Sequence, residues 1–411
     1  MSNMKKIVIT GMGAVTPVGI GIDEYWKNIT EGKSGIDTIK TFDPSELAVQ
    51  IAGEVKNFNP SDYLAKDLIR KTDPFMQYAY VAAEEAIKQS GIEIEPERTG
   101  IIMGTAMSGV ATTAFTQDAL SGASHKKVGP RFIPKILGNI AAANIAIDYN
   151  IQGPSFTVST ACSSGGDAIN TACMCMQAGK ADVMLAVGAE SVLCPLVIYS
   201  LANAKALSRR NDDPKTAIRP FDVTRDGFVI GEGGGALVLE TEEHALARGA
   251  KIFGEVKGCG NTCDAHHVTA PHPEGRGAIA CMKQALADAG IDASEIGYVN
   301  AHGTATNKGD TVETGAIKSV FGDKLPYVSS TKGATGHMMG AGGITETIAC
   351  VKAIETGVIP PTINLNEIDP ECEGIDFVPN TAKKADIRYA MSNAFGFGGQ
   401  NSSIIVGKYE G

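Results

Sequence analysis

The sequence contains no apolar run long enough to cross a membrane and no excess of basic residues over its 411 positions. Its formal net charge is −10, which disfavours binding of nucleic acid through overall charge, so an acidic partner would need a local basic patch. The N-terminal residues MSNMKKIVITGMG lack the pattern of a secretory signal and lead directly into an apolar segment. We therefore expect a cytoplasmic protein that binds neither membrane nor nucleic acid.

A disulfide framework is also missing. The chain has nine cysteines, an odd number without a signal sequence, which indicates reduced thiols. Cys259 and Cys263 precede three histidines (His266, His267 and His272), but a C-x3-C spacing followed by these histidines fits no common zinc site. The sequence thus disfavours a zinc ion.

The sequence does contain a regular alternation of predicted strands and helices. Apolar segments predict strands at residues 6–10 (ending at Gly11), 100–104, 183–187 and 235–239. Helical spacing occurs between them, at residues 23–31, 73–90, 139–149, 168–176 and 192–206. This alternation indicates an α/β fold.

The second half of the chain repeats the first. Residues 84–106 match residues 283–305 without a gap, at a separation of 199 positions. Residues 158–165 resemble residues 329–336 at a separation of 171, so the first half carries 28 additional residues between the two blocks. A helix, a glycine stop, a loop and a buried strand recur in the same order in both copies.

The repeat divides the chain into two similar α/β units, residues 1–250 and 251–411, which we expect to pack with pseudo-twofold symmetry. Ligands of such sheets bind at the loops beyond the strand ends. A site between the two units would draw residues from both.

Cys162 lies where a strand predicted from residue 156 gives way to a helix predicted up to residue 176. A thiol at the start of a helix is close to the positive end of the helix dipole and to unpaired N–H groups, which favours the thiolate. Its small neighbours leave room for a substrate, although the G-x-S-x-G form of a nucleophile elbow is absent. Two interpretations are open on this segment alone: a nucleophile and a buried structural cysteine.

The second half carries basic residues at the matching loop positions. His302 falls where the first half has Met103, Lys332 falls where it has Ala161, and His337 follows five residues after Lys332. One half thus supplies a thiol and the other supplies basic groups, a combination suited to covalent acyl transfer. Taken singly, each histidine could be structural and the lysine could be a solvated surface charge.

Two carboxylates follow His302 in the sequence. Asp310 and Glu313 could hold Lys332 or orient an imidazole, and the ordinary alternative is that they cap the start of a helix.

Four segments, TACSSG, NAHGTAT, SSTKGATGH and NAFGFGG, resemble the signature set of the β-ketoacyl-acyl-carrier-protein synthases, and they occur in the family's order and spacing. The resemblance extends over essentially all 411 residues and is strongest to the elongating type II synthases of bacterial fatty acid synthesis. It implies a thiolase-like fold with two pseudo-symmetric halves in a layered αβαβα arrangement. It also implies a homodimer and, as partner, an acyl carrier protein.

The resemblance implies a role for each matched residue. Cys162 would accept an acyl chain from the phosphopantetheine thioester of the carrier protein, and malonyl-carrier protein would then lose CO2 and attack the acyl-enzyme in a Claisen condensation. His302 and His337 would stabilise the enolate as neutral hydrogen-bond donors. Lys332, paired with Glu313, would organise the site electrostatically. No cofactor is required, since the loss of CO2 supplies the carbanion.

Phe397, in the sequence GFGG, matches the family's gating phenylalanine, and its flanking glycines would permit its motion. The ordinary alternative is a core aromatic. The backbone N–H groups of Cys162 and Phe397 match the oxyanion hole. The residues expected along the substrate are Thr304, Thr306 and Thr269 for the pantetheine amides, and Met107 and Leu201 for the acyl chain.

Two further sets of residues follow from the resemblance. The basic residues expected to dock the acidic carrier protein are Lys66, Arg70 and Lys71 in one cluster and Lys205, Arg209 and Arg210 in another. For each cluster the alternative is an ordinary solvated face. The residues matching a structural Na+ or K+ site are Asn300, Glu346, Ser392 and Asn393.

The chain departs from the family pattern at Gln400, where threonine is usual, at Asn307, where proline is frequent, and in a shortened loop at residues 125–135. Acyl chain length, saturation and the choice between fatty acid and polyketide synthesis are therefore left open.

Several other functions were weighed against this one. A degradative thiolase would need a second catalytic cysteine near the C-terminus, where this chain has GFGG. An initiating condensing enzyme would have a Cys-His-Asn set, and the presence of Lys332 and His337 argues against it. A chain-length factor, which is a non-catalytic partner, would lack Cys162, and a cysteine hydrolase would have to admit water to the acyl-enzyme. A standalone polyketide ketosynthase shares the chemistry and stays open.

Overall fold

The computed structural model describes residues 5–121 and 128–411. Elements of the first half are β1 (Ile7–Thr16), β2 (Gly19–Ile20), α1 (Ile22–Thr30), β3 (Asp37–Thr38), β4 (Ile51–Ala52), α2 (Lys66–Lys71), α3 (Pro74–Ser90), β5 (Thr99–Gly104), α4 (Val110–Ser121), α5 (Phe132–Ile136), α6 (Asn139–Tyr149), β6 (Ser155–Val158), α7 (Ser164–Gln177), β7 (Val183–Glu190), α8 (Pro195–Asn203), β8 (Gly233–Thr241) and α9 (Glu242–Ala247).

Elements of the second half are β9 (Gly254–Cys263), α10 (Arg276–Ala289), β10 (Ile296–Asn300), α11 (Asn307–Phe321), β11 (Tyr327–Ser329), α12 (Lys332–Thr335), α13 (Gly342–Thr356), β12 (Val358–Ile359), β13 (Asp376–Phe377), β14 (Lys383–Lys384), β15 (Tyr389–Phe395) and β16 (Gln400–Gly407). No helix in the described ranges is both long and apolar enough to span a membrane.

The main sheet has the same strand order on either side of its centre. Counting outward, the first half runs β1-β8-β7-β5-β6 and the second half runs β9-β16-β15-β10-β11. In both halves the inner two junctions are antiparallel and the outer two are parallel. The prediction of two pseudo-symmetric α/β halves is therefore confirmed.

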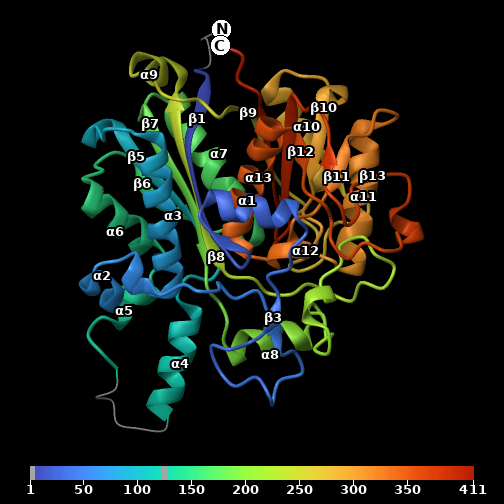
Figure 1. Cartoon of the computed structure of the whole chain (residues 1–411), viewed down its shortest axis with the longest axis horizontal. Coiled ribbons are helices and arrows are strands. Elements are labelled where there is room, and N and C mark those ends of the chain that lie inside the picture. The colour runs from blue at the N-terminus through green and yellow to red at the C-terminus, as the bar shows by residue number, and fades with distance from the viewer. Residues whose placement is uncertain (1–4, 122–127) are drawn as a thin grey trace.

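The halves of the sheet are stacked as layers with helices between and outside them (Figure 1). β1 and β9 pair over only three residues, and the two halves of the sheet then enclose α7 and α13. On β7, Met184 and Ala186 belong to the core shared with α7 and α13, whereas Val183 and Leu185 belong to the core under α3 and α6. A third core lies between α10, α11 and the second half of the sheet. The predicted αβαβα order follows from these alternating faces.

The internal repeat of the sequence is a repeat of structure. α3 ends at Gly91 and α10 ends at Gly290, and both glycines are left-handed, with φ of 60° and 65°. A short 3-10 turn and a buried strand follow in each copy, β5 in the first and β10 in the second. A left-handed residue after a helix is where glycine has the advantage over any L side chain, so the repeated glycines mark the repeated helix ends.

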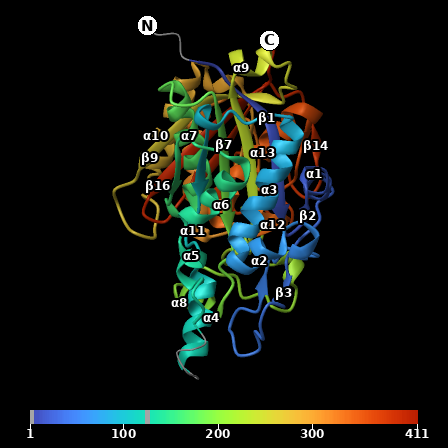
Figure 2. The same cartoon turned by 90° about the vertical axis from the view of Figure 1, so that its left-hand side faces the viewer.

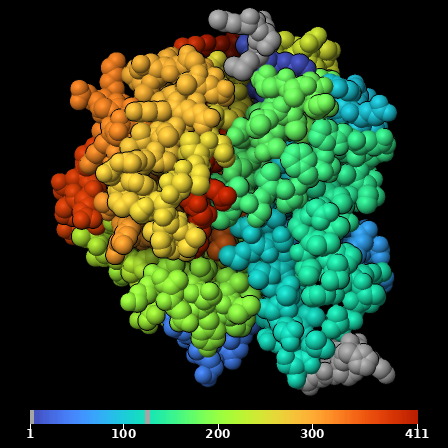
Figure 3. All heavy atoms as spheres, turned by 180° about the vertical axis from the view of Figure 1, so that it is seen from behind, coloured from blue at the N-terminus to red at the C-terminus, as the bar shows by residue number. Residues whose placement is uncertain are grey.

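The additional residues of the first half lie between β5 and β6 and include α4 and α5. α4 extends beyond the layered body (Figure 2). The shortened loop expected at residues 125–135 lies partly outside the described residues, and within it Phe132 begins α5. Viewed from behind, the two halves present adjoining surfaces, green and cyan for the first and orange for the second (Figure 3).

The prediction that the first strand ends at Gly11 is wrong, because β1 continues to Thr16. Gly11 and Gly13 do not make a turn; they allow α3 to lie directly against the strand. A Cβ atom at Gly11 would lie 2.1 Å from the carbonyl oxygen of Ala86, and one at Gly13 would lie 1.9 Å from that of Ala82. Glycine serves here for close approach of two backbones.

The helix predicted over residues 192–206 is shorter than expected. It begins at Pro195, a residue that suits the first helical position, after the extended Cys194, and it ends at Asn203. Val192 and Leu193 are buried in a separate core near α8. Their apolar character reflects burial and not helical periodicity.

α7 and α13 contact each other through their backbones at the centre of the molecule. A Cβ atom at Gly165 would lie 2.8 Å from the carbonyl oxygen of Gly340, and one at Gly343 would lie 2.3 Å from the backbone nitrogen of Gly166. The starts of the two central helices are thus held side by side. The loops that precede them, which carry Cys162 and His337, must meet there.

Replacement of Gly13 by alanine is expected to lower the free energy of unfolding by about 1–3 kcal/mol, because the new methyl group collides with the α3 backbone. The matched control is Gly315→Ala, an exposed position inside α11 with open space around the added methyl, which is expected to raise stability by about 0.5–1 kcal/mol. Urea unfolding followed by circular dichroism measures both. A Gly13→Ala variant as stable as the parent would contradict the packing.

Candidate active site

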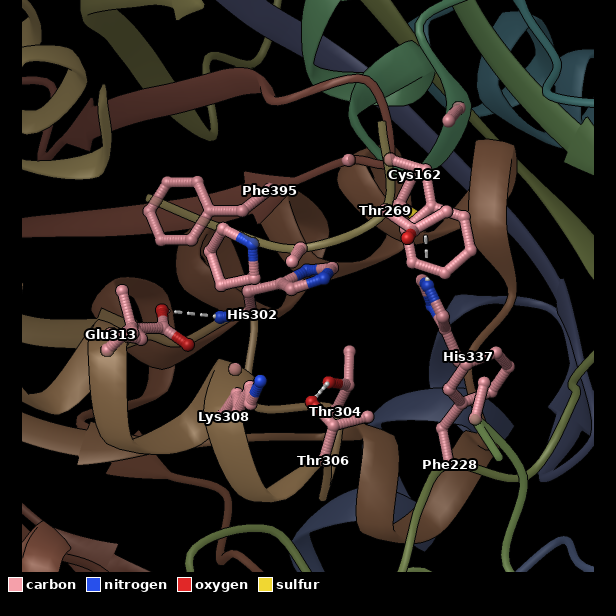
Figure 4. Close-up of a pocket in the computed structure, with 18 of the residues that line it drawn as sticks. Cys162, Phe228, Thr269, His302, Thr304, Thr306, Lys308, Glu313, His337 and Phe395 are labelled. Carbon is pink, nitrogen blue, oxygen red and sulfur yellow. Dashed lines mark hydrogen bonds between the residues drawn. The ribbon is translucent and has the colours of Figure 1, made fainter. Parts of the chain in front are cut away.

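A cavity of about 570 Å³ opens between the two halves, and residues of both halves line it. Cys162, which Figure 4 labels, comes from the first half, as do Met107 and Leu201. The predicted site residues of the second half that line it are Thr269, His302, Thr304, Thr306, Glu313, His337 and Phe397. With Lys205, which was predicted to dock a carrier protein, the structure brings eleven of the predicted residues to one cavity.

Cys162 sits on a short 3-10 turn, Ala161–Ser163, between β6 and α7. Ala161, directly before it, has φ of 50°, in the left-handed region that an L side chain adopts only at a cost of about 1–2 kcal/mol. The sharp turn from strand to helix exposes the thiol to the cavity. This is the geometry of a nucleophile elbow, although the sequence form of that motif is absent.

The thiol of Cys162 is hydrogen-bonded to His337, with Sγ 3.0 Å from Nε2 (Figure 4). The backbone N–H of Met339 donates to His337 Nδ1 at 3.4 Å, so Nδ1 acts as the acceptor. In a neutral imidazole the proton is then on Nε2, which donates toward the sulfur. His337 is therefore arranged as a hydrogen-bond donor and not as a base for the thiol.

Burial raises the pKa of the Cys162 thiol to about 11. The backbone N–H of Phe397 and the charge of Lys332 lower it in part, and the carboxylates Glu190 and Glu346 raise it further. The prediction that the start of the helix favours the thiolate is wrong, because desolvation raises the pKa of the thiol by more than the nearby donors lower it. At neutral pH the side chain of Cys162 is therefore a neutral thiol.

The second histidine, His302, lies beside the first. The two imidazole rings are 5.3 Å apart and almost perpendicular, at 85°. Burial, together with the positive charge of Lys332, lowers the pKa of both histidines well below the ordinary value. His302 Nδ1 is buried without a hydrogen-bond partner in the described structure. Both rings are therefore neutral at physiological pH.

The prediction that Lys332 pairs with Glu313 is wrong, because Lys332 pairs with Glu346 of α13. Its Nζ atom lies 2.5 Å from Glu346 Oε1, and both side chains are buried. Glu313 is occupied elsewhere, since its two oxygens accept the backbone N–H groups of His302 and Gly303, both at 2.8 Å. Lys332 does not line the cavity and acts on it through charge alone.

Asp310 and Glu313 both hold the loop that carries His302. Asp310 accepts the backbone N–H groups of Ala305 at 3.1 Å and Phe221 at 2.8 Å. Burial raises the pKa of Asp310 to about 6 and that of Glu313 to about 7, against these hydrogen bonds. The two carboxylates therefore orient backbone amides. The sequence analysis expected them to hold Lys332, to orient an imidazole or to cap a helix.

The loop that carries Phe397 passes directly over the nucleophile. Its backbone N–H acts on the Cys162 thiol, and its side chain lines the cavity with 40% of its surface exposed. A Cβ atom at Gly396 would lie 2.7 Å from the carbonyl oxygen of Thr160 and 3.2 Å from Cys162 N. Glycine at position 396 therefore keeps the backbone amide of Cys162 accessible. Gln400, the departure from the family pattern, closes the loop by accepting the Gly396 N–H at 2.7 Å through its backbone.

Glu190 is a buried site residue that the sequence interpretation missed. It ends β7 and accepts hydrogen bonds from the backbone N–H groups of Ala106 at 2.6 Å, Met107 at 3.1 Å and Gly340 at 3.2 Å. Burial raises its pKa to about 7. It thus ties the loop of Met107 to the loop after His337. The detectable signal was a carboxylate at the carboxyl end of a buried strand.

Three further cavity residues were missed. Phe228 packs edge-on against His337, with ring centroids 5.2 Å apart, and Phe395 packs against His302 at 5.9 Å. Lys308, at the start of α11, lines the cavity and is exposed. Nothing in the periodicity distinguishes these residues from ordinary core aromatics or a solvated lysine.

The residues predicted to dock a carrier protein lie on two surface segments. Lys66, Arg70 and Lys71 are on α2, where Asp67 lies 3.6 Å from both Arg70 and Lys71. Lys205 lines the cavity itself. Arg209 is exposed, and Arg210 donates to the Thr224 carbonyl at 2.7 Å and lies 3.8 Å from Asp226.

The residues predicted to hold a cation are buried on adjacent elements. Asn300 of β10 and Ser392 of β15 are register partners, Asn393 follows Ser392, and Glu346 is on α13, which packs on both strands. Asn300 Oδ1 is buried with no hydrogen-bond partner in the described structure. An unsatisfied buried oxygen on one of these residues fits the oxygen ligands that a hard cation requires.

Comparison with known proteins agrees with this geometry. The family model described as Beta-ketoacyl synthase, N-terminal domain, matches residues 4–245, and the one described as Beta-ketoacyl synthase, C-terminal domain, matches residues 253–366. Curated relatives named 3-oxoacyl-[acyl-carrier-protein] synthase 2 are similar over the full length: that of Synechocystis is 42% identical over 100% of both chains, and that of Vibrio harveyi is 43% identical over 98% of this chain and 99% of its own.

Solved structures show the same likeness in three dimensions. The ishigamide ketosynthase/chain length factor superposes with a TM-score of 0.93 at 34% identity, covering 99% of this chain and 100% of its own. A β-ketoacyl synthase from Burkholderia phymatum superposes with a TM-score of 0.91 at 35% identity, with the same coverage. The family-model matches and the full-length relatives together show that the chain belongs to the β-ketoacyl synthase family.

Proposed function

We propose that the protein is a 3-oxoacyl-acyl-carrier-protein synthase that elongates acyl chains by decarboxylative condensation. The observation that carries this proposal is the convergence of Cys162, His302 and His337 in one cavity between the halves. Full-length relatives named 3-oxoacyl-[acyl-carrier-protein] synthase 2, at 42–43% identity, support the substrate class.

The first step is transfer of an acyl group to Cys162. Its sulfur forms a thioester with the acyl carbonyl carbon, and the bond to the phosphopantetheine sulfur of the carrier breaks. The thiol proton of Cys162 ends on the departing carrier thiol, so the exchange needs no net acid or base. Backbone N–H groups of Cys162 and Phe397 are suited to stabilise the oxyanion formed on the way.

The second step uses the two histidines. Malonyl-carrier protein loses CO2, and the resulting enolate carries its charge on the thioester oxygen. Neutral imidazoles that donate N–H bonds stabilise that oxygen without first giving up a proton. The enolate carbon then attacks the acyl-Cys162 carbonyl, the C–S bond breaks, and the sulfur of Cys162 leaves as a thiolate, which takes up one proton from water to restore the thiol. The loss of CO2 supplies the carbanion, so the chemistry needs no cofactor.

The buried pair of Lys332 and Glu346 sets the electrostatics of the site. Burial, reinforced by the charge of Lys332, lowers the pKa of both histidines and keeps them neutral, and the same charge opposes the effect of the nearby carboxylates on Cys162. A Na+ or K+ ion held by Asn300, Glu346, Ser392 and Asn393 would add positive charge next to this pair. The unsatisfied oxygen of Asn300 supports such a site.

An acyl carrier protein is the partner that this chemistry requires. A solved relative, 31% identical, is described as a type II PKS acyl-carrier protein in complex with its ketosynthase. Lys205 and Lys308 both line the cavity and are exposed, where they can attract an acidic carrier despite the net charge of −10. The cluster on α2 offers a second contact.

A homodimer is supported by the exposed edge of the sheet. β6 is the outermost strand of the first half and is largely exposed, with Phe156 at 42%. An unprotected edge strand pairs readily with another strand. The exposed Ile133 and Leu137 near α5 would extend an apolar contact with a second copy.

Polyketide synthesis is the second candidate. One structural neighbour is described as a type II PKS ketosynthase and another as a ketosynthase/chain length factor, but they are 31% and 34% identical, less than the curated synthases at 42–43%. A chain-length-factor role is disfavoured because Cys162 is present and bonded to His337. A cytoplasmic location stays a prediction.

The proposal is tested by incubating the protein with acyl-carrier proteins of graded length and malonyl-carrier protein, followed by intact mass of protein and products. Cys162→Ala is expected to abolish both acyl loading and condensation, because no other thiol lines the cavity. Cys263→Ala, at an exposed position outside the cavity, is the matched control and should retain both. Condensation by the Cys162→Ala variant would refute the mechanism.

His302→Ala is expected to retain acyl loading of Cys162 while malonyl decarboxylation falls by about 100-fold or more, since one of two donors to the enolate oxygen is lost. Loading is followed by intact mass and decarboxylation by CO2 release. His266→Ala, an exposed histidine outside the cavity, should change neither. A variant that loses loading alone would contradict the assigned role.

The resting thiol predicts a steep dependence on pH. Alkylation of Cys162 by iodoacetamide should accelerate about tenfold per pH unit from about pH 7 to about pH 10, because the thiolate fraction grows until the pKa of about 11 is reached. Peptide mapping by mass spectrometry separates Cys162 from the exposed Cys263, which serves as the internal control. A rate that levels off below about pH 8 would show that the site stabilises the thiolate after all.

A further inference from the structure

Asp167 lies in the first turn of α7, five residues after Cys162, and is not part of the mechanism above. It is buried, with 5% of its surface exposed, and does not line the cavity. Burial raises its pKa, while hydrogen bonds from Thr160, Asn261 and Ser163 oppose this. A buried carboxylate needs hydrogen-bond donors to offset the loss of water. The residues that supply these donors show which segments Asp167 holds in place.

One carboxylate oxygen of Asp167 contacts both sides of the nucleophile turn. Thr160 Oγ1, two residues before Cys162, donates to Asp167 Oδ2 at 2.5 Å. Ser163 Oγ, directly after Cys162, lies 3.2 Å from the same oxygen. The two residues that flank the Ala161–Cys162 peptide are thus tied to a single atom.

The turn between them requires such a constraint. Ala161 has φ of 50°, a conformation that persists only where its surroundings determine it. Ser164 adds local bonds, since Thr160 N–H donates to its hydroxyl at 2.9 Å and that hydroxyl donates to Ala161 O at 2.7 Å. These contacts shape the turn from within, whereas Asp167 fixes it to the body of α7.

The other carboxylate oxygen reaches the second half of the chain. Asn261 Nδ2, on β9, donates to Asp167 Oδ1 at 2.6 Å. The segment after β9 runs on to Asp264, whose backbone N–H donates to Gly399 O at 2.7 Å in the loop of Phe397. Asp167 therefore fixes the turn of Cys162 relative to the half that supplies His337 and Phe397.

We propose that Asp167 is a positioning residue for acyl transfer, holding the turn of Cys162 so that its sulfur faces His337 and the Phe397 amide. This inference rests on the proposed function. Asp167 acts on the step in which Cys162 Sγ attacks the thioester, where a displacement of about 1 Å costs roughly 100-fold in rate. The decarboxylation step depends on His302 and His337, which Asp167 does not touch.

The test compares Asp167→Ala, Asp167→Asn and the exchange variant Asp167→Asn/Asn261→Asp. The exchange restores a carboxylate–amide pair between α7 and β9 while leaving an oxygen at 167 for Thr160. The matched control is Asp288→Asn: Asp288 of α10 accepts the backbone N–H of Cys259 on the same strand β9 at 2.9 Å but does not reach the Cys162 turn. Single-turnover acyl loading, CO2 release from malonyl-carrier protein and thermal unfolding are measured for each.

Asp167→Ala is expected to lower the saturating rate of acyl loading by about 10- to 100-fold, with the half-saturating carrier concentration and the decarboxylation rate within about twofold of the parent. The exchange variant is expected to recover the rate of acyl loading to within about fivefold of the parent. The Asp288→Asn control is expected to load at the rate of the parent.

Parent-like loading by Asp167→Ala would overturn the inference. So would an equal loss of loading and decarboxylation, which indicates a general structural role, or an exchange variant no better than Asp167→Ala. Failure of the parent protein to load acyl groups at all would instead refute the proposed function, so the two failures are distinguishable.

Discussion

The backbone contact between α7 and α13 is the constraint on which the rest of the structure depends. Two helices can approach this closely only where side chains are absent, and Gly165, Gly166 and Gly343 provide that at the crossing. Because each helix belongs to a different half, the crossing fixes how the halves sit on one another. The loops before the two helices are then brought to one point, and a thiol and an imidazole 175 positions apart become hydrogen-bonded partners.

The electrostatics of the site favour neutral groups. Desolvation keeps Cys162 protonated and both imidazoles uncharged. The charge of buried Lys332, which acts on all three groups, is balanced by Glu346. A neutral site suits a reaction in which charge appears only transiently, on an oxyanion and then on an enolate. Preorganised N–H donors stabilise such charge without the reorganisation that free ions would need.

The sequence was sufficient for the architecture and for Cys162, His302 and His337 at the centre of the cavity, because both leave local or repeated signals. The gapless match of residues 84–106 to 283–305 predicted the symmetry, and polar exceptions within the repeat identified His302 and Lys332. It was insufficient for contacts between distant segments. The first strand was predicted to end at Gly11 although the glycines of β1 accommodate α3, and Lys332 was assigned to Glu313 although Glu346 is its partner. Protonation of Cys162 depends on burial, which no local pattern reports.

Because of the additional segment between β5 and β6, the two halves of the duplicated architecture contribute different elements to the molecule. The histidines, Lys332 and the loop of Phe397 belong to the second half, whereas Met107 and the helices α4 and α5 belong to the longer first half. Surface segments beyond strand ends tolerate change far better than buried strands do. The first half can therefore vary in these surface segments without disturbing Cys162, which lies on the turn between β6 and α7, or the histidines of the second half.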